Sequence, residues 1–160
     1  MRFASLFAVV CSLAPLVACG NSGSGDDGAD DVVDCTTAEY ANHDEFVVGL
    51  NHTGDMGLLN FKLLSAAPAA PALGYNAWQV EITSAATVAP MSNATLDVYP
   101  YMPKHGHGAG VDVEVMAMPT AGDYNLDPIN LHMPGLWEVT ITADTDAGTD
   151  SAVFRPCIPN

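Results

Sequence analysis

The chain has 160 residues, of which 19 are acidic and 4 are basic, and its formal net charge is −15. A protein of this charge has no cationic surface to displace counterions from phosphates, so we expect no nucleic-acid partner. The length predicts one domain, whose core must come from roughly the last 120 residues.

Residues 1–18 contain a single arginine and an apolar run that ends directly before Cys19. This pattern predicts an export signal, which is too short and wrongly flanked for a stable transmembrane span. The sequence LVAC at its end resembles a bacterial lipobox, which implies cleavage before Cys19 and a lipid on its sulfur. With Gly20 next, the pattern is similar to that of outer-membrane lipoproteins, here expected to face the periplasm. A plain secretory signal with an incidental cysteine is the alternative.

Residues 19–34 predict a lipidated tether between the signal and the folded domain. After Cys19 they read GNSGSGDDGADDVVD, with five aspartates and no periodic apolar face. Such a segment cannot bury enough surface to offset the entropy of ordering, and a flexible chain of this length reaches roughly 20 Å. We therefore expect the folded domain to occupy residues 35–160.

Two of the four cysteines remain after Cys11 leaves with the signal and Cys19 is lipidated. An exported compartment permits Cys35 and Cys157 to form a disulfide. Joining the two ends of the domain would restrict the unfolded chain by at most about 4 to 5 kcal/mol. Two free thiols that bind copper are the alternative.

From Glu45 onward, short runs with a period close to two are separated by Gly, Pro, Asn and Asp, and no window indicates an amphipathic helix. This pattern predicts an all-β fold, an antiparallel β-sandwich of seven or eight strands. Residues 51–57 are expected to be a turn-rich link, and residues 65–74 an extended connection. The predicted strands are residues 45–50, 58–64, 76–83, 94–101, 111–118, 125–133, 136–143 and 151–156.

Soft metal ligands are concentrated between Met102 and Met133, a stretch that holds three of the five histidines and four of the seven methionines. Thioether sulfur favours Cu(I), and imidazole suits copper, so the mixture points first to copper. His105 and His107 are one residue apart, which places both imidazoles on one side of an extended segment, where they can chelate. A zinc site of three histidines is the alternative, although zinc sites rarely contain methionine.

Strand parity adds further candidates. Met133 alternates with His132 at the end of an apolar strand, so His132 is the better candidate to face a shared pocket. In residues 111–118, Met116 and Met118 share the polar face, so either a bulge turns the strand over or these thioethers line a surface site. The alternative for each histidine alone is a hydrogen-bonded turn or surface residue. The expected first-choice ligands are Met102, His105, His107 and His132, and the second-choice ligands are Met116, Met118 and Met133.

Four segments together resemble the YtkA-like family of small exported bacterial proteins. They are SAAPAAPALGYN with WQVEIT, then YMPKHGHG, then GDYN, and finally LHMPGLWEVTIT, and they span about residues 65–142. The resemblance implies an immunoglobulin-like β-sandwich, often on lipoproteins or beside copper-handling and cytochrome-oxidase assembly genes. By position, Met102, His105 and His107 match its histidine motif. The second motif is matched by Met133, Pro134, Gly135 and Trp137, whereas His132 rests on parity alone.

These observations predict a lipid-anchored, non-enzymatic domain of the bacterial cell envelope that binds or delivers copper, as Cu(I). Its expected partners are the membrane, through the lipid, and a copper-receiving envelope protein. We find no glycine-flanked nucleophilic serine and no Cys–His pair for catalysis. The alternative function is a structural or protein-binding β-sandwich lipoprotein without metal, in which MPKHGHG and HMPG are packing turns.

Overall fold

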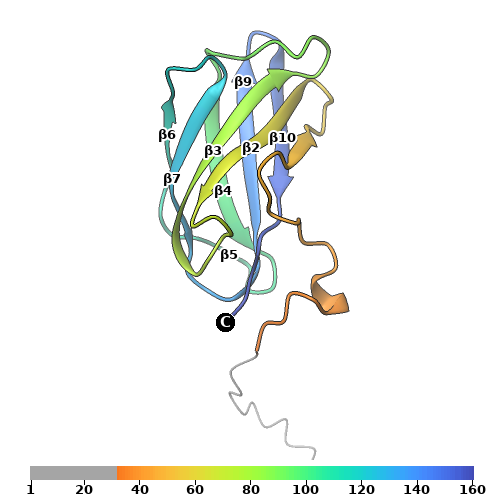
Figure 1. Cartoon of the computed structure of the whole chain (residues 1–160), viewed down its shortest axis with the longest axis vertical. Coiled ribbons are helices and arrows are strands. Elements are labelled where there is room, and N and C mark those ends of the chain that lie inside the picture. Colours follow the sequence, from red (N-terminus) through yellow and green to blue (C-terminus); the bar gives the residue numbers. More distant parts are fainter. Residues whose placement is uncertain (1–31) are drawn as a thin grey trace, which may run out of the picture. The chain divides into compact units, whose positions relative to one another are not determined.

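The structure is a computed structural model that describes residues 32–160. The expected signal peptide (1–18), the lipidation residue Cys19 and most of the tether lie outside the described residues. Within them, one 3-10 helix, η1 (Ala38–Tyr40), accompanies eleven β-strands, and there is no α-helix (Figure 1). The predicted all-β class is confirmed.

Two antiparallel sheets pack face to face as a sandwich, as predicted. The five-stranded sheet has the order β1 (Asn51–Thr53), β2 (Leu59–Ala67), β3 (Gly74–Ser84), β7 (Asp123–Leu131) and β6 (Glu114–Ala117). The four-stranded sheet has the order β10 (Gly148–Phe154), β9 (Glu138–Thr145), β4 (Thr95–Met102) and β5 (His107–Gly108). A separate two-stranded ladder joins β8 (Gly135–Leu136) to β11 (Cys157–Ile158).

The core lies between the two sheets and follows the alternation of the sequence. In β9, Val139, Ile141 and Ala143 are fully buried, while the residues between them are partly exposed. In β3, Trp78 is fully buried, and its ring lies 4.6 Å from that of Phe46. Removing apolar surface from water in this way supplies most of the favourable free energy of folding.

The prediction of a strand over residues 45–50 is wrong. Gly49 has a φ of +93°, and a turn forms there, which leaves Val47 and Val48 exposed. The segment still contacts β2, since the Gly49 N–H donates to the Leu63 carbonyl at 2.8 Å. Residues 51–57, expected to be only a turn-rich link, begin with the short strand β1, which pairs with β2.

Strand β6 is shorter than predicted but keeps the predicted parity. Val113 and Val115 pack against the core, whereas Met116 is 54% exposed. The pairing of β6 with β7 is continuous, with Met116 opposite Asn125. No bulge therefore turns this strand over, and Met116 lies on the outer face of the sheet.

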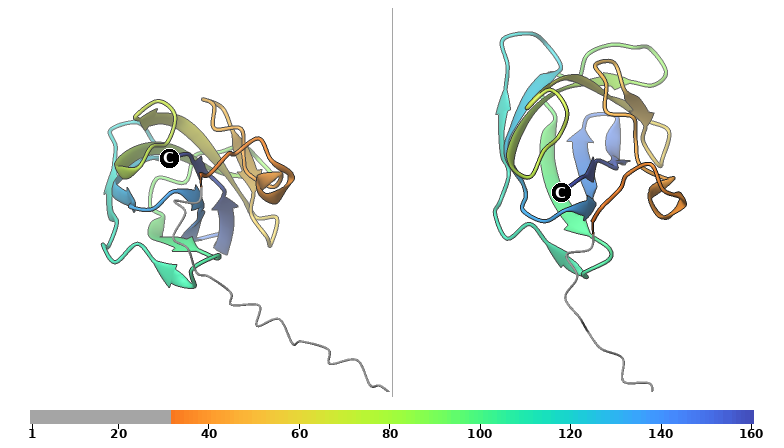
Figure 2. Two further views of the ribbon diagram at one scale, coloured as in Figure 1. Left: turned by 90° about the horizontal axis from the view of Figure 1, so that it is seen from below. Right: turned by 60° about the horizontal axis from the view of Figure 1, so that its bottom comes forward.

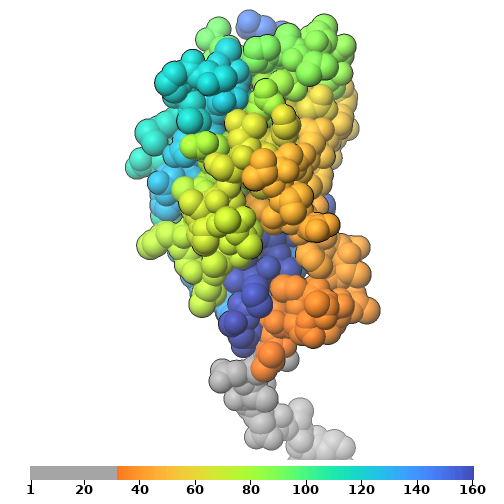
Figure 3. Space-filling model, viewed as in Figure 1, coloured from red at the N-terminus to blue at the C-terminus, as the bar shows by residue number. Residues whose placement is uncertain are grey.

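The N-terminal segment, residues 32–44, is fixed against the C-terminal strands. It runs beside them in Figures 2 and 3. The predicted disulfide between Cys35 and Cys157 is present, with an S–S distance of 1.99 Å. The Arg155 N–H donates to the Asp44 carboxylate at 2.6 Å, and the Asp44 N–H donates to the Arg155 carbonyl at 2.8 Å. These bonds connect both ends of the domain.

A buried carboxylate holds the turn that precedes β2. Asp150 of β10 is 2% exposed, and its oxygens fill the space that a side chain at Gly54 would occupy. Burial raises the pKa of Asp150, but its hydrogen bonds outweigh this effect, so the pKa lies below its ordinary value. The four donors are the backbone N–H groups of Met56, Leu58, Leu59 and Ser151.

Candidate functional site

Two turns meet at the end of the sandwich where β5 lies (Figure 1). The first is the MPKHGHG turn between β4 and β5, which the Met102 carbonyl closes by accepting N–H groups of His105 at 3.2 Å and Gly106 at 2.9 Å. Gly106 has a φ of +70°, which favours glycine, and the reversal places His107 opposite Met102. The second is the HMPG turn, residues 132–135, which follows β7.

The imidazoles of the two turns lie next to one another. The ring centroids of His107 and His132 are 5.5 Å apart, with planes inclined by 24°, and those of His105 and His107 are 5.9 Å apart. His105 and His132 are exposed, and His107 is half-buried. The three histidines predicted as ligands therefore form a group that solvent can reach.

A hydrogen bond fixes the tautomer of neutral His107. Its Nδ1 lies 2.9 Å from the carbonyl oxygen of Gly108, which can only accept, so Nδ1 carries the hydrogen and donates. The Nε2 atom of the neutral ring then has the free lone pair. This is the arrangement in which an imidazole is ready to bind a metal ion through Nε2.

The donor set fits a soft metal ion only in part. Two imidazoles that share one ion have ring centroids about 5 to 6.5 Å apart, because metal–nitrogen bonds are about 2 Å long, and both histidine pairs fall in this range. Within residues 32–160, however, no group of three or more His, Cys, Asp or Glu side chains could hold a metal ion. The rings of each pair are thus close enough to share an ion, and a third ligand would have to come from rotation of His105 or from a thioether.

Met102 does not lie at the surface of this group. Its side chain is fully buried in the core, and its terminal methyl carbon lies 2.5 Å from the position that a Cβ atom would take on Gly135. The contact joins the MPKHGHG turn to the HMPG turn by packing. Met133 is half-buried and also packs against the core. The structure thus gives Met102 a packing role where the sequence predicted a first-choice ligand.

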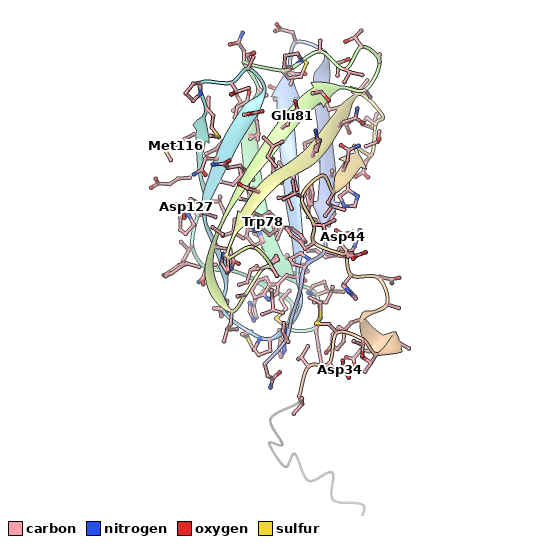
Figure 4. The ribbon with its side chains drawn as sticks, in the orientation of Figure 1. Asp34, Asp44, Trp78, Glu81, Met116 and Asp127 are labelled. Carbon is pink, nitrogen blue, oxygen red and sulfur yellow. A yellow bond between two sulfur atoms is a disulfide. The ribbon has the colours of Figure 1, made fainter. Side chains whose placement is uncertain are left out.

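Met116 and Met118 are not brought to the histidines. Met116 pairs with Asn125, seven residues before His132 along β7, which at about 3.3 Å per residue is a separation of roughly 20 Å. Figure 4 shows Met116 on the outside of β6, away from the end where β5 lies. The Met118 N–H donates to the Asp123 carbonyl, at the opposite end of β7 from His132. The predicted second-choice ligands on this strand are therefore remote from the site.

Two aromatic residues lie beside the motifs that carry the histidines. Trp137 is fully buried, and its ring centroid lies 5.3 Å from that of His132 and 6.4 Å from that of His107. On the other side, the ring of Tyr99 packs onto the backbone of Gly108. The sequence analysis includes Trp137 in the second motif and Tyr99 in the predicted strand of residues 94–101, but the alternation does not reveal which residues they contact.

The two remaining histidines, His43 and His52, lie elsewhere. His43 Nδ1 lies 2.7 Å from the Tyr40 carbonyl oxygen, and His52 Nε2 lies 3.1 Å from the Asp44 carboxylate. Both rings therefore have local partners in or near the N-terminal segment.

The sequence model of the YtkA-like family matches residues 59–142, from the first residue of β2 into β9. The chain belongs to the YtkA-like family. The YtkA-like region contains both turns, the three neighbouring histidines and Trp137, whereas Cys35 and Cys157 lie outside it. Comparison of the chain with curated proteins and with solved structures finds no match. Residues 32–160 contain no helix with the length and apolar character needed to cross a membrane.

Proposed function

We propose that this YtkA-like domain is a non-enzymatic copper-binding or copper-delivery domain that takes Cu(I). The observation that supports this proposal is the approach of His105, His107 and His132 from two separate turns. His107 and His132 would hold the ion, and exposed His105 would be the third ligand. When bound, Cu(I) would supply a soft ion that accepts two or three ligands and exchanges between sites of similar chemistry.

The choice of copper over zinc rests on the ligand set. A zinc site needs at least three protein ligands, and no three His, Cys, Asp or Glu side chains of residues 32–160 converge on one ion as they stand, whereas His107 and His132 alone could hold Cu(I). Cu(I) tolerates fewer ligands and accepts thioether sulfur, and half-buried Met133 directly follows His132. A low-coordinate ion therefore suits this site better.

The location of the domain follows from its disulfide and, as a proposal, from the N-terminal sequence. The Cys35–Cys157 disulfide indicates an extracytoplasmic domain, because cytosolic reductants keep thiols reduced. A lipid on Cys19 would hold it at the outer membrane, and residues 20–34 would let it reach a copper-receiving envelope protein. Mass spectrometry of the membrane-extracted protein tests this part, since an unmodified Cys19 would contradict it.

A Cu(I) titration against a competing chelator tests the metal proposal. The protein is the fragment 32–160, which contains the whole core and the disulfide. We expect one Cu(I) per domain, lost in His105→Ala/His107→Ala and weakened at least tenfold in His132→Ala. His43→Ala, which removes a histidine outside the site, is the matched control and should bind as the parent does. Equal, weak binding by all four proteins would refute a copper site.

A second candidate function is a structural or protein-binding sandwich without metal. The observation that favours it is the packing of Met102 against Gly135, together with the hydrogen bond from His107 to its neighbour's carbonyl, since both give these motifs a packing role. In that case, replacing His105 and His107 would leave Cu(I) affinity unchanged, and pull-down from envelope extracts with the fragment would be the next experiment.

A further inference from the structure

Trp137 is held rigidly beneath the two turns. Its side chain is fully buried, its Nε1–H donates to the Met133 carbonyl at 2.9 Å, and its backbone N–H donates to the Pro156 carbonyl at 3.0 Å. The first bond ties the indole to the residue after His132. The indole therefore cannot move away from the histidines without disturbing the HMPG turn.

The indole and the two nearer imidazoles form a compact triangle. The planes of His132 and His107 are inclined to the Trp137 plane by 67° and 74°, which is the arrangement in which the edge of one ring meets the face of another. The Nε1 edge of the indole is taken by the Met133 carbonyl. The indole face is therefore left available to the imidazole edges, which carry the ring nitrogens.

The triangle limits where an ion shared by the two imidazoles would lie. The point midway between the His107 and His132 centroids is about 5 Å from the Trp137 centroid, and an ion bonded to one nitrogen of each ring would lie within about 2 Å of that point. On the side of the indole, such an ion is inside the roughly 6 Å over which a cation interacts with an aromatic face. Trp gives the strongest interaction of this kind. No carboxylate completes a group of three ligands within residues 32–160, so neutral imidazoles leave the charge of the ion to be offset by other means.

We infer that Trp137 is part of the metal site, with its indole face against the Cu(I) ion held by His107 and His132. This inference rests on the proposed function and adds a residue that does not ligate. A cation–π contact offsets the charge of a monovalent ion better than that of a divalent ion, because a divalent ion loses more free energy when it gives up water or carboxylate ligands. Trp137 thus favours Cu(I) over Cu(II) and Zn(II) at this site.

The test uses fluorescence, because the chain has only two tryptophans. In Trp78→Phe, Trp137 is the sole indole, and in Trp137→Phe, Trp78 remains within the core beside Phe46. Each protein is titrated with Cu(I) without oxygen, recording emission and, in parallel, chelator competition. Circular dichroism establishes that each variant is folded.

We expect stoichiometric quenching of Trp137 emission in Trp78→Phe and unchanged Trp78 emission in Trp137→Phe. We also expect Trp137→Phe to bind Cu(I) about 3- to 30-fold more weakly while its Zn(II) affinity stays the same. If Trp137→Phe does not fold, wild type and His132→Ala are compared instead. Cu(I) should then quench the tryptophan emission of wild type and leave that of His132→Ala unchanged.

Two kinds of failure are distinguishable. Stoichiometric Cu(I) binding by Trp78→Phe without a change in Trp137 emission would overturn the role of Trp137 and leave the copper site intact. The same conclusion follows if Trp137→Phe binds Cu(I) as tightly as the parent. No Cu(I) binding by any protein would overturn the proposed function and this inference together.

Discussion

The hydroxyl oxygen of Tyr99 lies 2.9 Å from the position that a Cβ atom would take on Gly108, and two of its ring carbons lie within 3.2 Å of that position. The second glycine of HGHG is therefore required by the tyrosine that packs on it. Because Gly108 follows His107 and supplies the carbonyl that fixes its tautomer, this contact also positions the imidazole.

Gly108→Ala should lower the free energy of unfolding by about 1 to 3 kcal/mol, since an added methyl group must displace the Tyr99 ring. Urea denaturation of the single variants and the double variant measures the effect. In a Tyr99→Ala background the same substitution should cost little, because the colliding ring is gone. An equal cost in both backgrounds would show that the glycine is needed for another reason.

Asp150→Asn should lower the free energy of unfolding at pH 7 by about 2 to 4 kcal/mol, because it weakens four charge-assisted hydrogen bonds at once. The pKa of Asp150 is below its ordinary value in the folded state. Its stabilisation is therefore complete above about pH 4 and is lost as the pH falls through the folded-state pKa. Acid titration of stability should accordingly be flatter in the variant; Asp146→Asn, in an exposed turn, is the control and should match wild type.

Asp123→Asn should raise stability at pH 7 by about 0.5 kcal/mol, since Asp123 lies opposite Glu81 in the β3–β7 register. Burial and the Glu81 charge raise the pKa of Asp123, and Lys62 partly offsets them. A raised carboxyl pKa costs stability while the group is ionised, so the gain should vanish as the pH falls below about 3.9, where Asp123 is protonated in both states. Lys62→Gln should act in the opposite direction, and thermal melts at pH 7 and pH 3.5 measure both.

Loss of the disulfide should destabilise the domain by at most about 4 to 5 kcal/mol in the loop-entropy model, because Cys35 and Cys157 are 122 residues apart. Urea denaturation of Cys35→Ser/Cys157→Ser measures this, and reduced wild type should behave alike. A loss below about 1 kcal/mol would indicate that the Asp44–Arg155 bonds alone keep the two ends together.

The strands of the sandwich were predictable because one face of each strand is buried in the core and the other is exposed to solvent. Seven of the eight predicted strands have a counterpart in the structure. The alternation is clearest in β3, with Trp78, Val80 and Ile82, and in β9, with Val139 and Ile141. Residues 45–50 misled because their apolar side chains suggested burial, whereas Gly49 turns the chain and leaves two valines exposed.

The grouping of the three histidines was predictable because two of them are neighbours in the chain, while the full burial of Met102 was not. Local spacing shows that His105 and His107 can act together, and parity favoured His132. Nothing local distinguishes a methionine ligand from a methionine that fills the core, since both suit a thioether. The burial of the Met102 side chain depends on Gly135, a residue 33 positions later, against which Met102 packs.

The pairing of β8 with β11 makes the site dependent on residues far along the chain. Leu136, directly after the HMPG turn, pairs with Cys157, and Trp137 is bonded to Pro156. A chain that emerges from a translocation channel with its N-terminus first therefore cannot complete the histidine end until residues 156–158 have crossed. In an exported chain, this order would delay the grouping of the histidines until the domain had left the compartment in which it was made.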